Sequence, residues 1–175
     1  MRPGELIHNC FSYHLVPAGL MFDLAARTLG CAVVPGGVGQ TDIQLQTIAD
    51  LKPAAYAGTP SFLKILLEKA AEDGVDVSSM TCAAVGAEPF PPSVRQAIQD
   101  LGVTALQNYG TGDLGLIAYE SAAVDGMILG EEIIVEILRP GTGDPVAEGE
   151  VGEVVVTNLA PAYPLIRFAT GDMSA

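Results

Sequence analysis

The sequence predicts an α/β fold, in which a parallel sheet flanked by helices is followed by an antiparallel β subdomain. Up to residue 113, short apolar runs alternate with segments of helical spacing that end at glycines, which is typical of parallel strands joined by helices. After that point, strand-like runs follow one another and are separated by turns that contain Gly and Asp. We therefore expect an α/β subdomain at residues 1–113 and a mainly β subdomain at residues 114–175.

Four segments of the first part are predicted to be helices because their apolar residues recur at helical spacing. They span residues 17–29, 41–51, 60–73 and 91–101. Thr41 and Thr59 are expected to cap the second and third helix, since a threonine hydroxyl can accept a hydrogen bond from an amide of the first turn. The helices alternate with four predicted strands at residues 31–35, 54–58, 82–86 and 103–110. Further strands are expected at residues 116–121, 132–140, 152–159 and 164–170.

The composition is unusually poor in charge, because only 17% of the residues are charged, compared with about 25% in an average soluble protein. No apolar run approaches the roughly 18 residues of a membrane-spanning helix. The excess apolar side chains must therefore lie in a core or against another protein surface. We expect either a homo-oligomer or one part of a longer polypeptide, and no association with a membrane.

The net charge of −13 argues against a nucleic-acid-binding protein, because eight basic residues among 21 acidic ones cannot follow a phosphate backbone. The three cysteines, Cys10, Cys31 and Cys82, are widely spaced, which fits neither a disulfide framework nor a zinc site. The N-terminal residues lack the basic start and long apolar stretch of a signal peptide. These observations predict a cytoplasmic protein.

The tripeptide Thr-Gly-Asp occurs three times, at residues 111–113, 142–144 and 170–172. The middle copy lies between two predicted strands and is explained by a hairpin-type turn. The first copy follows a predicted parallel strand, and open α/β sheets bind ligands at the carboxyl ends of such strands. The third copy ends in Asp172, a carboxylate that could hold a pair of ribose hydroxyls. A simple turn remains the alternative for both the first and the third copy.

The residues of the first copy and its neighbours have chemistry suited to a nucleotide. Gly110 and Gly112 would let the backbone approach a ligand closely. Tyr109 offers an aromatic face for stacking, and Asp113 is a hard oxygen ligand suited to Mg²⁺.

The segment from Gly86 to Pro89 is a second candidate, because it follows another predicted parallel strand. A tight exit at Gly86 would leave peptide groups free to contact the edge of a heterocycle. Glu88 before Pro89 is equally explained as a surface acid in an extended segment. His8 and His14 have no cysteine or paired acid at metal-ligand spacing, and the glycine-rich residues 36–40 are interpreted as a loop.

Taken in order, several segments resemble the adenylate-forming, AMP-binding acyl-CoA ligases, with the phenylacetate–CoA ligase-like branch as the most similar. The segments are HNCFSYHLVPAGL, LGCAVVPGG, GTPSFLKILLEKA, VGAEPFPPSVRQAI, QNYGTGDLG and PLIRFATGD. The resemblance covers nearly the whole chain and implies part of the large N-terminal domain of such an enzyme. Its members use ATP to convert a carboxylic acid into an acyl-adenylate, from which CoA displaces AMP to give a thioester.

The resemblance also implies roles for individual residues. The adenine would lie along Gly86, Ala87, Glu88 and Pro89, and Tyr109 and Gly110 would form the purine and substrate wall. Thr111 would approach the phosphate, Asp113 would take the place of the usual Glu as Mg²⁺ ligand, and Asp172 would hold the ribose. Tyr13 and His14 match a segment that lines the acyl pocket.

The chain departs from the family pattern in three respects. The phosphate-gripping loop is expected before residue 1 and the C-terminal lid with its lysine after residue 175, so the chain alone is not expected to complete the reaction. Asp113 is one methylene shorter than the usual Glu, and Ala169 replaces a common Arg. Two alternatives stay open: a non-catalytic α/β module for nucleotide binding or assembly, and an adenylate-forming enzyme with an acyl acceptor other than CoA.

Overall fold

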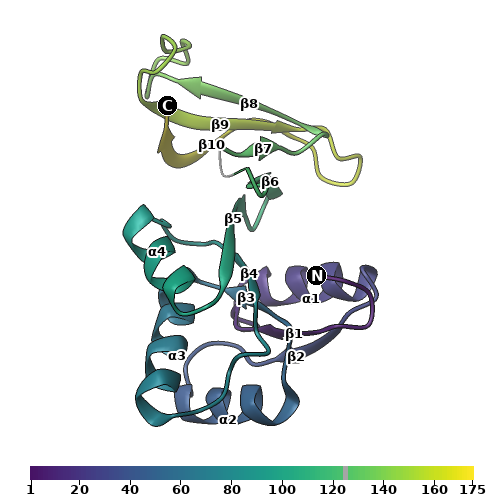
Figure 1. Cartoon of the computed structure of the whole chain (residues 1–175). Coiled ribbons are helices and arrows are strands. Elements are labelled where there is room, and N and C mark those ends of the chain that lie inside the picture. Colours follow the sequence, from purple (N-terminus) through teal and green to yellow (C-terminus); the bar gives the residue numbers. More distant parts are fainter. Residues whose placement is uncertain (124–125) are drawn as a thin grey trace.

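The computed structural model describes residues 1–123 and 126–175 and contains two β-sheets (Figure 1). The larger sheet has the strand order β2-β1-β3-β4-β5-β6-β7, and the smaller has the order β10-β9-β8. The larger sheet consists of β1 (Leu6–Asn9), β2 (Ala32–Pro35), β3 (Ala55–Gly58), β4 (Cys82–Val85), β5 (Thr104–Thr111), β6 (Gly115–Tyr119) and β7 (Ile128–Leu129). The smaller sheet consists of β8 (Ile133–Leu138), β9 (Gly152–Asn158) and β10 (Leu165–Ser174).

The predicted fold class is confirmed. Neighbouring strands in the series β2-β1-β3-β4-β5 pair in parallel. The pairs β5–β6 and β6–β7 and all pairs of the smaller sheet are antiparallel. Two strands were not predicted, β1 and β7, because β1 is short and half polar and β7 has only two residues. Since β6 and β7 extend the larger sheet, the smaller sheet begins at β8, while the division at residue 113 stays a prediction.

The helices are α1 (Ala18–Thr28), α2 (Thr41–Leu51), α3 (Pro60–Asp73) and α4 (Pro92–Asp100). The capping of α3 is as predicted, since the Thr59 hydroxyl accepts a hydrogen bond from the Phe62 amide at 3.4 Å. The predicted cap of α2 is wrong, because Thr41 is the first helical residue and Gln40 occupies the N-cap position in a left-handed conformation. None of the described helices has the length and apolar character that crossing a bilayer requires.

The helices cover the two faces of the larger sheet unequally. On one face, α2, α3 and α4 share a core with Tyr56, Ala83, Val85 and Ala105, which alternate along three neighbouring strands. On the other face, α1 packs over the first three strands of the sheet order, through a cluster that includes Phe11. This second face is therefore less covered over β4 and β5, and the cavity described below opens there.

Strand β5 changes its partner halfway along its length. Residues 104–107 pair with β4 in parallel, and residues 108–111 pair with β6 in an antiparallel hairpin. The hairpin is fixed to α4 by an ion pair in which one guanidinium nitrogen of Arg95 donates to both carboxylate oxygens of Glu120, at 2.6 and 2.9 Å. Arg95 also donates to the Ala105 carbonyl at 2.9 Å, and its guanidinium lies 4.3 Å from the centre of the Phe90 ring.

The middle Thr-Gly-Asp lies between β8 and β9, and its predicted role as a turn is confirmed. The Thr142 hydroxyl accepts a hydrogen bond from the Asp144 amide at 3.1 Å, and the Asp144 carbonyl accepts one from the Arg139 amide at 2.8 Å. These bonds close the turn within the segment itself.

We predict that Arg95→Ala lowers the free energy of unfolding by about 2–4 kcal/mol, because it leaves a nearly buried carboxylate without its partner. The Glu120 side chain is only 10% exposed. Urea denaturation should show the loss. Arg139→Ala is the matched control, since Arg139 and Glu150 are 56% and 48% exposed and such a pair contributes about 0–1 kcal/mol. Equal effects of the two substitutions would contradict the assignment.

Candidate functional site

The first Thr-Gly-Asp forms the hairpin turn between β5 and β6. The Thr111 hydroxyl accepts a hydrogen bond from the Leu114 amide at 3.1 Å, which closes the turn. A Cβ atom at Gly110 would lie 2.4 Å from the Gly115 carbonyl oxygen, so only glycine allows the two strands to approach this closely. The segment is a turn, but it also borders a cavity, since Thr111 and Gly112 line it.

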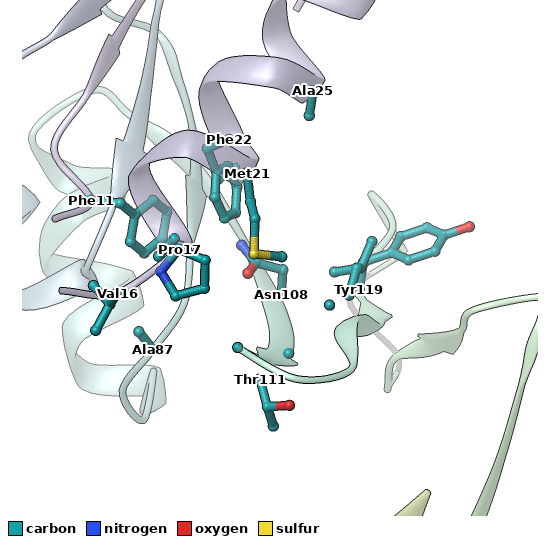
Figure 2. Close-up of a pocket in the computed structure, with 16 residues that line it drawn as sticks. Phe11, Val16, Pro17, Met21, Phe22, Ala25, Ala87, Asn108, Thr111 and Tyr119 are labelled. Atoms are coloured by element: carbon teal, nitrogen blue, oxygen red, sulfur yellow. The ribbon is translucent and has the colours of Figure 1, made fainter. Parts of the chain in front are cut away.

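An apolar cavity of about 490 Å³ lies between α1 and the carboxyl ends of β4 and β5 (Figure 2). Its lining residues are Phe11, Val16, Pro17, Ala18, Met21, Phe22, Ala25, Ala84, Ala87, Asn108, Gly110, Thr111, Gly112, Gly115, Leu116 and Tyr119. None of these described residues carries a charge at neutral pH. Figure 2 shows Met21 and Phe22 extending from α1 toward Asn108, whereas the Tyr119 hydroxyl points away from them. A cavity of this size and character suits the apolar body of a small ligand.

The loop 86–89 forms part of the cavity wall through Ala87. A Cβ atom at Gly86 would lie 2.5 Å from the side-chain oxygen of Asn108, which explains why glycine stands there. Ala87 has φ +65°, a left-handed conformation that is unusual for a residue with a side chain. The Glu88 carboxylate accepts a hydrogen bond from the Ser61 amide at 2.6 Å, and therefore faces the first turn of α3.

Asn108 joins this loop to the hairpin, and we did not predict its role from the sequence. Its side-chain nitrogen donates to the Val85 carbonyl at 2.9 Å, and the residue also lines the cavity. In the sequence, Asn108 was marked only as part of the tripeptide Asn-Tyr-Gly, which belongs to a segment that resembles the family.

Tyr109 connects the third Thr-Gly-Asp to strand β5. Its hydroxyl donates to the Asp172 carboxylate at 2.7 Å and lies 3.2 Å from the Thr170 hydroxyl. Thr170 in turn donates to the Val154 carbonyl at 2.9 Å and accepts from the Asp172 amide at 3.1 Å. Burial, reinforced by Asp172, raises the pKa of Tyr109 to about 12, so its hydroxyl keeps its proton at neutral pH.

Asp113 lies exposed in the hairpin turn, next to the cavity-lining residue Gly112. Within residues 1–123 and 126–175, no three His, Cys, Asp or Glu side chains are grouped to hold a metal ion. Mg²⁺ is commonly held by one or two carboxylates together with substrate phosphates. Asp113 therefore fits a metal that arrives with a triphosphate, and it does not form a preassembled metal site.

Tyr13 and His14 are not among the residues that line the described cavity. The Tyr13 hydroxyl accepts a hydrogen bond from the Asn9 side chain at 2.8 Å and donates to Asp23 at 3.3 Å. Burial, followed by the charge of Asp23, raises the pKa of Tyr13 to about 12. His14 is exposed. Their role in the acyl pocket stays a prediction.

Other aromatic residues of this part of the chain do face the cavity. The Phe11 and Phe22 rings stack at a centroid distance of 4.3 Å and both line it. Periodicity alone could not identify them, because a helix face that lines a cavity has the same spacing as one that packs in a core.

A buried polar cluster holds the glycine-rich loop after β2. The Gln44 side-chain nitrogen donates to three carbonyls of this loop, at distances of 3.3, 2.9 and 3.0 Å for Gly36, Gly37 and Gly39. The Gln44 oxygen must then accept, so the His8 ring donates to it through Nε2. His8 Nδ1 is buried without a partner among the described residues, and burial lowers the pKa of His8, opposed by the bond to Gln44.

Fold and site together define an open α/β protein with a ligand cavity at the carboxyl ends of its parallel strands. The sequence pattern of the family described as AMP-binding enzyme matches residues 11–162. The chain therefore belongs to the AMP-binding enzyme family.

The similar proteins support this assignment. Phenylacetate-coenzyme A ligases from Thermus thermophilus and Escherichia coli are 34% and 35% identical over 181 aligned residues, which include 99% and 98% of this chain. The chain spans 41% of the length of each. A 2-hydroxyisobutyryl-CoA ligase, crystallised with 2-HIB-AMP and CoA, has a TM-score of 0.90 and 25% identity, and the match covers 99% of this chain and 41% of that one. An anthranilate CoA ligase with anthranoyl-AMP shares the fold at a TM-score of 0.76 and 18% identity, over 99% of this chain and 37% of that one.

We predict that the protein loses stability when the pH falls from 7.5 to 5.5, because of His8. Its folded-state pKa lies below the ordinary value of 6.5, so the unfolded chain takes up a proton that the folded chain resists. The contribution to stability is complete above pH 6.5 and declines below it, by up to about 1.4 kcal/mol per pH unit.

Urea midpoints at pH 7.5, 6.5 and 5.5 test this dependence. His8→Gln should lower the stability at pH 7.5 and flatten the pH dependence. His14→Gln, which changes the exposed histidine, should keep it. An unchanged slope in His8→Gln would show that another group is responsible.

Proposed function

We propose that this chain forms the nucleotide- and acid-binding groove of an AMP-forming acid–CoA ligase, and that the full-length parent catalyses the complete reaction. The observation that carries the proposal is the contact between Tyr109 and Asp172, since the residues on either side of Tyr109, Asn108 and Gly110, line the apolar cavity. A candidate ribose ligand and a candidate acyl pocket thus lie next to one another.

The reaction has two steps. In the first, a carboxylate oxygen of the acid attacks the α-phosphorus of ATP, and the bond to pyrophosphate breaks with its electron pair leaving on pyrophosphate. In the second, the CoA thiolate attacks the acyl carbon and AMP leaves. Both reactants of the first step are anions, so catalysis depends on positioning and on neutralising charge more than on a general base.

The residues of the groove would divide this work. The Asp172 carboxylate would accept hydrogen bonds from the ribose, and the Tyr109 ring would lie against the purine. Thr111 would approach the phosphates from the hairpin turn. The uncharged cavity would hold the apolar part of the acid and exclude water, which supports an arylacetate-like substrate.

Mg²⁺ is proposed to accompany ATP, with Asp113 as its protein ligand. When bound, the metal neutralises negative charge on the phosphates. Asp113 supplies the same carboxylate chemistry as the usual Glu with a side chain one methylene shorter. A cytoplasmic location is proposed as well, supported by the free thiols of Cys10, Cys31 and Cys82. Self-association of the parent is a further proposal, supported by the exposed apolar residues Leu20 and Leu24.

We predict that the full-length parent releases AMP and pyrophosphate when it is given ATP, Mg²⁺, CoA and phenylacetate. Asp172→Ala should raise the KM for ATP at least tenfold, because the ribose loses hydrogen bonds to a charged acceptor. Asp50→Ala, which removes an exposed acid on α2, is the control. Release of AMP without a CoA thioester would point to another acyl acceptor, and a parent that forms no AMP with any carboxylic acid would refute the proposal.

We predict that Tyr109→Phe weakens the binding of AMP roughly fivefold or more, because the ring remains while the hydroxyl that orients Asp172 is lost. Titration calorimetry on the full-length parent measures the affinity, and Tyr163→Phe serves as an exposed control. A gain in affinity would instead show that the Tyr109 hydroxyl competes with the ribose for the carboxylate.

A further inference from the structure

We infer that Glu88 is a positioning residue that fixes the loop 86–89 against α3 and does not itself touch the nucleotide. The inference rests on the proposed function, because only that function brings a nucleotide to this loop. In this inference the Glu88 carboxylate bonds to the protein itself, at the Ser61 amide, and the peptide groups before Glu88 are free to contact the ligand.

The first observation is the partner of the carboxylate. At the start of α3, Pro60 has no amide hydrogen and the Phe62 amide donates to the Thr59 hydroxyl at 3.4 Å. The amide between them belongs to Ser61, and it donates to Glu88 at 2.6 Å. A carboxylate at the N-terminus of a 14-residue helix is further stabilised by the helix dipole. Glu88 therefore completes the cap of α3 from a distant part of the chain.

The second observation is the way in which the loop is held on its other side. The Gly86 amide donates to the Gly58 carbonyl at 3.2 Å, and Gly86 packs so closely against Asn108 that a Cβ atom has no room. Between these two attachments, Ala87 keeps its left-handed conformation. Such a conformation persists where the surrounding contacts fix it on both sides.

The attachment also decides what faces the groove. Ala87 lines the cavity, while the carboxylate of the next residue is directed to α3. If Glu88 turned to a bound purine, Ser61 would lose its acceptor and the strained residue would lose its support. Glu88 therefore acts on the ligand through the loop, and its effect must extend to purines that lack the 6-amino group, because the wall formed by Ala87 borders any ligand in the cavity.

The 6-amino group of the purine distinguishes positioning from direct contact. In the full-length parent, KM and kcat are measured with ATP and with purine riboside triphosphate, which lacks that amino group. Positioning predicts that Glu88→Ala raises the KM for both nucleotides, roughly tenfold for ATP. It also predicts that Glu88→Gln stays within about threefold of the unmodified protein, since its amide oxygen can still accept from Ser61.

Glu72→Ala is the matched control, because Glu72 is an exposed acid on α3 itself. Its KM values should match those of the unmodified parent. A selective loss in Glu88→Ala, in which ATP is weakened and the analogue is not, would overturn the inference in favour of direct recognition of adenine.

Hydrogen exchange separates a failure of this inference from a failure of the proposed function. Without nucleotide, the Ser61 amide should exchange at least tenfold faster in Glu88→Ala than in Glu88→Gln or Glu72→Ala. Unchanged exchange would overturn the inference even if ATP binds normally. Faster exchange in a parent that binds no nucleotide would refute the proposed function and, with it, the role of Glu88 toward a ligand. The assignment of Glu88 as a cap of α3 would still hold.

Discussion

The change of partner along β5 is the constraint on which the two parts of the structure depend. When a strand leaves a parallel ladder, backbone N–H and C=O groups of its former neighbour lose their partners. Such groups are costly to leave unpaired when they are buried. The Asn108 side chain satisfies the Val85 carbonyl at that point, so β4 can end while β5 continues into the hairpin with β6. The next residue, Tyr109, then reaches the smaller sheet through Asp172. One strand thereby connects the parallel sheet, the cavity and the β10 strand.

Three carboxylates of the chain illustrate how charge is used to fix local structure. Glu88 caps a helix, Glu120 fixes the hairpin to α4, and Asp172 receives a tyrosine hydroxyl. Each of these carboxylates is paired with a specific donor, and for the partly buried Glu88 and Glu120 this pairing limits the cost of removal from water. Asp113 differs from Glu88 and Glu120, since it is exposed at the end of a turn. In the proposed function Asp113 would meet a hydrated cation that arrives with the substrate, and a carboxylate in that role gains nothing from burial.

How far the sequence predicted the structure depended on whether a signal was local. The alternation of strands and helices and the start of α3 at Thr59 were correct, because periodicity and capping are properties of neighbouring residues. Strand β1 was missed because two of its four residues, His8 and Asn9, are polar, and their buried hydrogen bonds go to groups distant in the sequence, Gln44 and Gly19. The contact between Tyr109 and Asp172 joins positions 63 residues apart, so no spacing could reveal it, and only the family resemblance placed both residues at one nucleotide.

The three Thr-Gly-Asp copies show why an identical tripeptide does not fix a role. In the middle and the last copy, the threonine hydroxyl accepts a hydrogen bond from the amide of the aspartate two residues on, so the local geometry is shared. In the middle copy the Thr142 hydroxyl donates back to the Arg139 carbonyl of its own loop, and Arg167 of β10 donates to the Gly143 carbonyl at 3.0 Å. Thr170 instead donates to a carbonyl of the neighbouring strand β9, and the last copy lies within β10, where Asp172 accepts from Tyr109. The two copies thus differ in the acceptor of the threonine hydroxyl. In the surface turn it is a carbonyl of the same loop, and in the copy with the candidate nucleotide-binding residue Asp172 it is a carbonyl of a neighbouring strand.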